Sequence, residues 1–246
     1  MRRLFFPFSG NSILLNGEAF HHLVRVNRAN VEDEIEVADG QGRVVRARIA
    51  SINEGQAELT VLKEVETKIE PEINLVLGFG LLKGEKSDWL IQKATELGVR
   101  EIWPLALDHS VVQLDEKKGK DRAVRWQKIA TEATQQCGRD RVPLVKVPMK
   151  LSQALSSFRQ DGIVIMPHEA LPEHSLKRVL KTSEPIKDVF LIIGSEGGFS
   201  AEETKLAEEQ GVKLVNLGPR ILRAETAALA GAGMILYEWA DLGGTQ

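Results

Sequence analysis

A polar segment with one proline, residues 66–72, separates two kinds of hydrophobic pattern, and no other feature constrains the fold of this chain as strongly. Before the segment, apolar residues recur mostly at every second position between tight turns, which is typical of half-buried strands. After it, short strand-like runs alternate with stretches of helical spacing, which is typical of an α/β domain. We therefore predict two domains, residues 1–70 and residues 71–246.

The first domain is predicted to be a small antiparallel β-barrel. Its strands are expected near residues 35–37, 44–52 and 57–65. Turns rich in glycine and polar residues separate them at residues 39–42 and 53–55. One short helix, residues 18–26, is expected to interrupt the strands, because Phe20, Leu23 and Val24 are at helical spacing.

The second domain is predicted to be an α/β domain with a mostly parallel sheet. Its strands are expected at residues 73–78, 101–105, 144–147, 163–166, 189–193 and 214–217. Two helices have clear ends. Ser200 and Glu203 form a capping box for a helix that stops at Gly211, and a helix that begins near Ser87 stops at Gly98.

The composition excludes several classes of protein. Among the 246 residues, 43% are hydrophobic and the formal net charge is −3, which excludes a disordered chain and a uniformly basic coat for nucleic acid. The single cysteine, Cys137, cannot form an internal disulfide, which indicates a reducing compartment. His21 and His22 have no partners at metal-ligand spacing, so we assign no metal. No apolar run reaches the roughly 18 residues of a membrane span and none resembles a secretory signal, so we expect a cytoplasmic protein.

The most specific local feature is a glycine-rich loop, residues 194–198, between a buried strand and the capped helix. Glycines let the backbone turn sharply and expose N–H groups to a ligand. The loop contains Glu196 and no Lys or Arg, and a carboxylate would repel a phosphate. The loop therefore favours a ligand with hydrogen-bonding edges and a positive centre. The alternative is an ordinary strand-to-helix turn.

A second loop, residues 217–223, follows the next predicted strand along the chain and precedes an apolar helix. In open α/β sheets, ligands bind beyond the carboxyl ends of the strands, and we expect this loop to lie beside the first. Arg220 and Arg223 flank Ile221 and Leu222, which would suit a flat ring gripped by aliphatic side chains. The alternative is that the arginines are solvated and the aliphatic pair belongs to the core.

Two further features are less specific. His168 and Glu169 follow a predicted strand, but neighbouring side chains on a strand point in different directions, so a surface loop is the favoured interpretation. The residues between 117 and 150 include ten basic against three acidic ones, which favours contact with a polyanion. The alternative for this stretch is the solvated face of a helix. Lys83 and Lys86, after a glycine-containing strand end, are candidate phosphate contacts.

In chain order, five motifs resemble those of the RsmE family, bacterial methyltransferases of the SPOUT superfamily that modify N3 of a uridine in small-subunit (16S) ribosomal RNA. The motifs are residues 82–86, 92–98, 136–139, 193–199 and 217–227. The resemblance extends over nearly the whole chain. Ser195 is a departure, because many relatives have proline at this position.

The resemblance implies a fold and a cofactor. The fold would be a PUA-like amino-terminal barrel for RNA and a carboxyl-terminal SPOUT domain with a trefoil knot, paired as a homodimer. The methyl donor would be S-adenosyl-L-methionine. The residues that the family's motifs assign to this donor are Glu169, Gly194, Glu196, Gly197, Gly198, Leu217, Gly218, Ile221, Leu222 and Arg223.

Methylation of uracil at N3 needs a base or a stabiliser of the resulting anion, because this nitrogen carries a proton. We expect Arg223 to hold the developing negative charge and either Glu225 or Glu196 to accept the proton. Basic residues expected to contact ribosomal RNA are Arg2, Arg3, Arg25, Arg28, Lys83, Lys86, Lys93 and Arg139. Two alternatives are open: a SPOUT methyltransferase for another base or a ribose 2′-hydroxyl, and a non-catalytic RNA-binding assembly factor.

Overall fold

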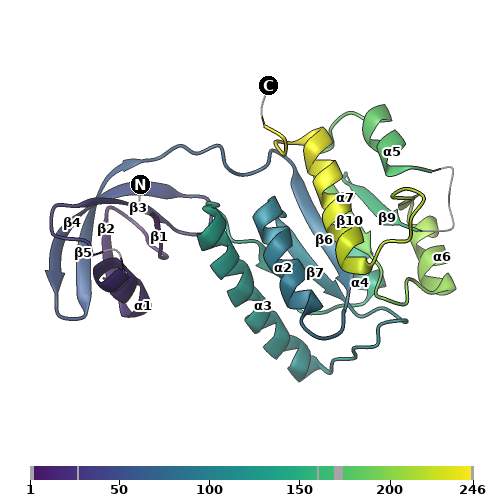
Figure 1. Ribbon diagram of the computed structural model, residues 1–246, viewed down its shortest axis with the longest axis horizontal. Helices are drawn as coiled ribbons and strands as arrows, with labels where there is room; N and C mark the ends of the chain where they lie inside the picture. Colours follow the sequence, from purple (N-terminus) through teal and green to yellow (C-terminus); the bar gives the residue numbers. More distant parts are fainter. Residues whose placement is uncertain (1–2, 27, 160, 169–173, 245–246) are drawn as a thin grey trace. The chain divides into compact units, whose positions relative to one another are not determined.

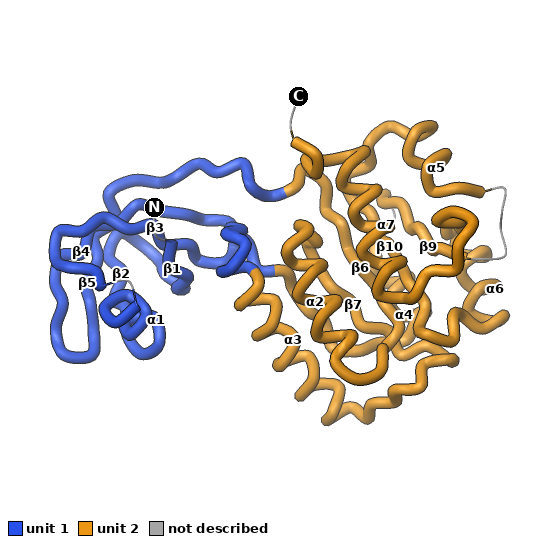
Figure 2. Tube along the Cα trace, viewed as in Figure 1, with its two compact units in different colours: residues 1–70, 134–142 blue, residues 71–133, 143–246 orange. Residues whose placement is uncertain are grey.

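A computed structural model describes residues 3–26, 28–159, 161–168 and 174–244. The chain forms two compact units (Figure 2). Unit 1 contains residues 1–70 together with residues 134–142, and unit 2 contains residues 71–133 and 143–246. The sequence pattern did not predict that residues 134–142 pack with the first unit.

Unit 1 is built on one five-stranded sheet with the strand order β1-β3-β4-β5-β2. Its elements are β1 (Arg3–Phe5), β2 (Ser12–Asn16), α1 (Gly17–His21), a π-helical turn (His22–Val26), β3 (Glu34–Ala38), β4 (Val44–Asn53) and β5 (Gln56–Glu64). The strands predicted near residues 35, 44 and 57 are confirmed. The sheet is antiparallel except that β1 pairs in parallel with β3, so the prediction of a purely antiparallel barrel was wrong for this pair. Leu15, Leu23, Val37 and Leu59 lie in its core.

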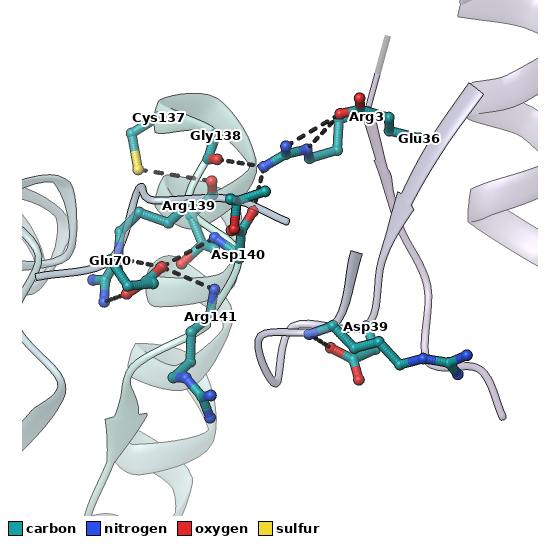
Figure 3. A network of polar contacts seen from close by, with 12 residues as sticks. Arg3, Glu36, Asp39, Glu70, Cys137, Gly138, Arg139, Asp140 and Arg141 are labelled. Carbon is teal, nitrogen blue, oxygen red and sulfur yellow. Dashed lines mark hydrogen bonds and ion pairs between the residues drawn. The ribbon is translucent and has the colours of Figure 1, made fainter. Parts of the chain in front are cut away.

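Glu70 and Arg3 connect residues 138–141 to the rest of unit 1 (Figure 3). The Glu70 carboxylate accepts hydrogen bonds from the Arg139 guanidinium at 2.7 Å and from the backbone N–H groups of Asp140 and Arg141. Arg3 pairs with Asp140 and Glu36 and donates to the Gly138 carbonyl at 2.8 Å. Charge-assisted hydrogen bonds of this kind are among the stronger polar contacts in proteins. They fix the end of the long helix α3 (Glu116–Cys137) in unit 1.

Unit 2 contains a six-stranded, entirely parallel sheet with the order β11-β9-β10-β6-β7-β8. The strands are β6 (Asn74–Gly80), β7 (Glu101–Leu105), β8 (Leu144–Val145), β9 (Ile163–Pro167), β10 (Asp188–Ile193) and β11 (Lys213–Val215). All six predicted strands and the parallel sheet are confirmed. β9 lies between β10 and β11 in the sheet, so the two candidate ligand loops follow strands that are not hydrogen-bonded to each other.

Helices cover both faces of this sheet (Figure 1). Besides α3, they are α2 (Lys86–Leu97), α4 (Leu151–Ser157), α5 (Leu176–Thr182), α6 (Ala201–Glu209) and α7 (Ala224–Trp239). α7 packs on β6 and β10 and also contacts α2 and α5. On the other face, α4 and α6 contribute Leu151, Ala154 and Ala207 to a core around Trp103 and Phe190. In the described part of the chain, no helix combines the length and the apolar character that crossing a membrane would need.

The predicted helix ends are confirmed. Ser200 caps α6, its hydroxyl accepts the Glu203 N–H at 3.1 Å, and the Glu203 carboxylate accepts the Ser200 N–H at 2.9 Å. α2 ends at Gly98, which has a left-handed backbone with φ of +103°. A Cβ atom at Gly98 would lie 2.6 Å from Cγ of Pro71. Position 98 therefore requires glycine both for its backbone angle and for this close approach.

We expect Gly98→Ala to lower the free energy of unfolding by about 2–4 kcal/mol, because backbone strain and the clash with Pro71 add. Gly211→Ala is the matched control. Gly211 follows α6 with φ of +73°, and a Cβ there would meet no atom within 4 Å, so only a backbone cost of about 1–2 kcal/mol applies. Urea unfolding measures both, and equal losses would contradict the role of the Pro71 contact.

Candidate functional site

The glycine-rich loop follows β10, and the second loop follows β11, at the same edge of the parallel sheet (Figure 1). The carboxyl end of β9 lies between them. His168, after β9, donates its backbone N–H to the Val215 carbonyl at 2.7 Å. Glu169, which the family's motifs assign to the methyl donor, lies outside the described residues. The structure thus brings both predicted loops to the edge where open α/β sheets bind ligands.

The glycine-rich loop has its shape because side chains are absent at two positions. A Cβ at Gly194 would lie 3.1 Å from the backbone of Gly198, and one at Gly197 would lie 2.8 Å from Cβ of His109. The His109 ring donates from Nδ1 to the Gly197 carbonyl at 2.9 Å. Ser195, where the resemblance leads us to expect proline, takes part in the turn, since its Oγ accepts the Gly197 N–H at 3.3 Å.

Two residues that the sequence analysis missed, Asp108 and His109, support this loop. The Asp108 carboxylate accepts a hydrogen bond from the Ser200 hydroxyl at 2.6 Å, and the Asp108 N–H donates to Glu203 at 3.0 Å. The segment after β7 is therefore tied to the first turn of α6 as well as to Gly197. The sequence signal for Asp108 and His109 was their position just after a predicted strand of the parallel sheet. Residues of an ordinary loop can occupy the same position, so this signal did not identify them.

Glu196 is held by donors from the segment between β6 and α2. Its Oε1 accepts the backbone N–H of Lys83 at 3.2 Å and lies 3.2 Å from Nζ of Lys86. Partial burial opposes ionisation of Glu196, but the backbone N–H groups of Lys83 and Glu196 and the ammonium of Lys86 outweigh it and hold the pKa of this carboxyl below its usual value. Glu196 is therefore a carboxylate at neutral pH.

Glu225 lies in the first turn of α7 and shares the same lysine. Its Oε1 is 3.8 Å from Nζ of Lys86, and its side chain is 15% exposed. Its Oε2 is buried and has no hydrogen-bond partner among the described residues. An unpaired buried carboxylate oxygen is uncommon, because it has lost water without gaining a donor. Lys86 thus brings together the two carboxylates that the sequence analysis proposed as alternatives.

The second loop exposes the groups expected to contact a ligand. Ile221 is 84% exposed, and Leu217 and Leu222 are half-buried. The alternative in which Ile221 belongs to the core is therefore wrong. Gly218 has φ of +113° and donates its N–H to the Asn216 side chain at 3.1 Å. Arg223 precedes α7 as an exposed residue.

The candidate RNA contacts differ in how far they are available to a phosphate. Exposed ones are Arg25, Arg28 and Lys83. Half-buried ones with acidic partners are Arg3, Lys86 and Lys93. Arg139 is 3% exposed and paired with Glu70, so the expectation of a phosphate contact there was wrong: the arginine stabilises unit 1 instead. Arg2 lies outside the described residues.

The basic stretch between residues 117 and 150 is not one patch. Residues 134–142 belong to unit 1 and the remainder to unit 2. On α3, Lys118, Lys120 and Lys128 pair with acidic residues of the same segment, and Arg125 pairs with Asp88. The opposite side of α3 is buried through Ala123, Trp126 and Ala130. The alternative of a solvated helix face therefore describes this segment better than a polyanion site does.

A shallow hollow of about 430 Å³ lies in unit 1, lined by Phe6, Pro7, Phe8, Ser9, Ser12, Ile13 and Leu14. It is remote in sequence from both predicted ligand loops and contains none of their residues. The described residues contain no cluster of three or more potential metal ligands.

Two family models match the chain. A model described as an RNA methyltransferase domain matches residues 69–236, and one described as an RNA methyltransferase PUA domain matches residues 15–62. These matches, together with the parallel sheet and its loops, define an RNA methyltransferase with a PUA-like amino-terminal domain. The predicted fold class is confirmed to this extent.

Named relatives identify which family of RNA methyltransferases this chain resembles. Ribosomal RNA small subunit methyltransferase E of Bacillus subtilis is 34% identical over 237 residues, which cover 94% of this chain and 92% of the relative. The Neisseria gonorrhoeae protein of the same name, solved bound to S-adenosyl methionine, is 29% identical with a TM-score of 0.86 and covers 98% and 99% of the two chains. The putative methyltransferase Lpg2936 of Legionella pneumophila, solved with bound SAM, has a TM-score of 0.82, 29% identity and 98% coverage of both chains. The chain belongs to the family of ribosomal RNA small subunit methyltransferase E, the RsmE family.

We expect Gly197→Ala to lower the free energy of unfolding by about 1–3 kcal/mol, because the new methyl group would overlap His109. Gly119→Ala in α3 is the control, since a Cβ there makes ordinary contacts at 3.7 Å or more. In a helix this control change is expected to stabilise by about 0.5–1 kcal/mol. Urea unfolding measures both, and an unchanged stability of Gly197→Ala would contradict the tight packing of the loop on His109.

Proposed function

We propose that this protein is an S-adenosyl-L-methionine-dependent methyltransferase that methylates N3 of a uridine in small-subunit (16S) ribosomal RNA in the cytoplasm. The observation that carries the proposal is the edge of the parallel sheet in unit 2. There a glycine-rich loop with an ionised Glu196 and a second loop with an exposed Ile221 accompany a partly buried Glu225. The names of the relatives, and the S-adenosyl methionine bound to two of them, support methylation of small-subunit ribosomal RNA with this donor.

The residues of the two loops fit this methyl donor. Bare backbone groups around Gly194, Gly197 and Gly198 suit an adenosyl group and its polar edges, and the uncovered Ile221 suits an aromatic ring. The Glu196 carboxylate suits a positively charged sulfonium centre. Leu217, Gly218, Leu222, Arg223 and Glu169 complete the proposed set. When bound, the donor supplies an activated methyl group.

The protein's own residues must deprotonate uracil at N3. We assign this proton to Glu225: the N–H bond breaks, the proton passes to a carboxylate oxygen, and the electron pair remains on N3. The contacts favour Glu225 over Glu196, because Glu196 already accepts hydrogen bonds from Lys83 and Lys86 whereas one Glu225 oxygen has no donor among the described residues. We assign to Arg223, which is exposed, the stabilisation of negative charge on the base.

The proposal extends to the domains and the assembly. Unit 1 would bind RNA as the PUA-like domain, and residues 71–246 would form the SPOUT domain with its trefoil knot. We further propose a homodimer of the SPOUT domains. Its support is an uncovered apolar surface on the mutually packed helices α2 and α7, where Trp89, Met234 and Tyr237 are 45%, 37% and 67% exposed.

We expect Glu225→Gln and Arg223→Ala each to slow methyl transfer by about 100-fold or more, because the first removes the base and the second the stabilising charge. The assay is donor-dependent methylation of a small-subunit substrate, with the methylated atom located by nuclease digestion and mass spectrometry. Glu209→Gln, an exposed change in α6, is the control. Full activity of both variants would end the residue assignment, and a methyl group on another atom would end the assignment of N3.

RNA affinity should fall with rising salt, because each phosphate contact releases counterions. We expect Arg25→Gln and Arg28→Gln each to weaken RNA binding and to reduce the slope of log affinity against log salt concentration by about one. Arg159→Gln is the control, since Arg159 is exposed and pairs with Asp161 and Asp188. Fluorescence anisotropy measures the slopes. Identical slopes in the wild type and both barrel variants would show that these arginines make no phosphate contact.

A further inference from the structure

Lys86 is the shared partner of the two candidate proton acceptors. Its ammonium lies 3.2 Å from Glu196 and 3.8 Å from Glu225. The three side chains come from three places in unit 2: the start of α2, the loop after β10 and the first turn of α7. The sequence pattern predicts a phosphate contact for Lys86, but in the structure its ion pairs are with carboxylates.

We propose that Lys86 is a positioning residue, which holds the Glu196 and Glu225 carboxylates in place beside the glycine-rich loop and keeps Glu225 in the charged form that can take the proton of the substrate base. The inference deepens the proposed function and rests on it for the role of Glu225. Lys86 itself touches neither substrate nor cofactor in this scheme. It acts through the two carboxylates that it orients.

Lys86 acts on the two carboxylates through its charge. Oε1 of Glu196 and Oε1 of Glu225 both lie within 3.8 Å of Nζ of Lys86. Removal of this ammonium group would therefore leave two negative charges near each other. Like charges and burial both favour the protonated form of a carboxyl group. Glu196 keeps the Lys83 N–H as a donor, whereas the buried Oε2 of Glu225 has none among the described residues. Without Lys86, Glu225 is therefore the carboxyl group that we expect to become protonated. A neutral carboxyl group cannot accept the proton of uracil.

Other charged groups near Glu225 do not replace Lys86. α7 packs on α2, α5, β6 and β10. On α2, Asp88 pairs with Arg125, and Lys93 pairs with Glu96. β6 has no ionisable side chain, and Glu196 follows β10. The basic residues of α5 are Lys177, Arg178 and Lys181, and Arg223 precedes α7. Among the described residues, the cation that forms an ion pair with Glu225 is Lys86.

A spectroscopic titration tests the proposal without substrate. Glutamate labelled with carbon-13 at the carboxyl carbon is incorporated into the full chain, and the signals of Glu196 and Glu225 are assigned with Glu196→Gln and Glu225→Gln. We expect Lys86→Met to raise the titration midpoint of Glu225 by about one pH unit or more, whereas Lys86→Arg keeps it near the wild-type value. Lys205→Met is the matched control, because Lys205 makes an ion pair with Glu209 on exposed α6.

A second substitution separates positioning from a general loss of packing. In the Lys86→Met background, Glu196→Gln removes the neighbouring negative charge, so the midpoint of Glu225 should return toward the wild-type value. A merely structural role for Lys86 would not produce this rescue. An unchanged Glu225 midpoint in Lys86→Met would overturn the proposal.

The pH dependence of methyl transfer connects the titration to the reaction. Glu225 must be ionised to act, so kcat/KM should rise with pH as this carboxyl group loses its proton. In Lys86→Met this rising limb should move to higher pH, and in Lys86→Arg it should stay. A uniform loss of affinity for RNA with an unmoved limb would make Lys86 a phosphate contact and refute the positioning role. If wild-type protein shows the Glu225 titration but no methylation of any small-subunit substrate, the proposed function fails while the electrostatic role of Lys86 stands.

Discussion

The site depends on the absence of a side chain at Gly80, the last residue of β6. A Cβ at this position would lie 2.5 Å from the backbone nitrogen of Ser195 and 2.8 Å from Leu107. Without it, the loop after β10 lies directly against the end of β6, and the segment after β6 delivers Lys83 and Lys86 to Glu196. Gly78 makes room in the same way for the Phe190 ring, at 2.8 Å. Gly78 and Gly80 are therefore packing glycines, and they let the neighbouring strands β6 and β10 both contribute to the site.

Parallel strands place the ends of β6, β9, β10 and β11 at one edge of the sheet, but each following segment must still be held in position. The structure does this with polar contacts that cross between loops. His109 donates to the Gly197 carbonyl, and the Asp108 carboxylate accepts a hydrogen bond from the hydroxyl of Ser200, the cap of α6. Such contacts organise backbone groups before a ligand arrives, which reduces the ordering cost of binding. Contacts from its neighbours thus hold the glycine-rich loop in place, in addition to the close packing that its own glycines allow.

Local features were predictable from the sequence, and long-range ones were not. Ser200, Glu203 and Gly98 mark helix ends through contacts a few residues away, so their pattern is visible in the chain itself. The position of β9 between β10 and β11 depends on strand pairing, which periodicity does not encode. Arg139 looked like a surface cation, but Glu70, far away in the chain, buries it in unit 1. The role of Lys86 was hidden for the same reason, since its partners come from distant segments.

The charge of the cluster also suits the ligand. One ammonium faces two carboxylates, so Lys86, Glu196 and Glu225 together keep a net negative charge beside the two loops. A full complement of cations would repel a sulfonium ligand, and two carboxylates without Lys86 would favour protonation of one of them. A single lysine meets both constraints, because it forms an ion pair with each acid and still leaves one negative charge uncompensated. Arg223, which is exposed just before α7, is the cation that we assign to the negative charge of the substrate base.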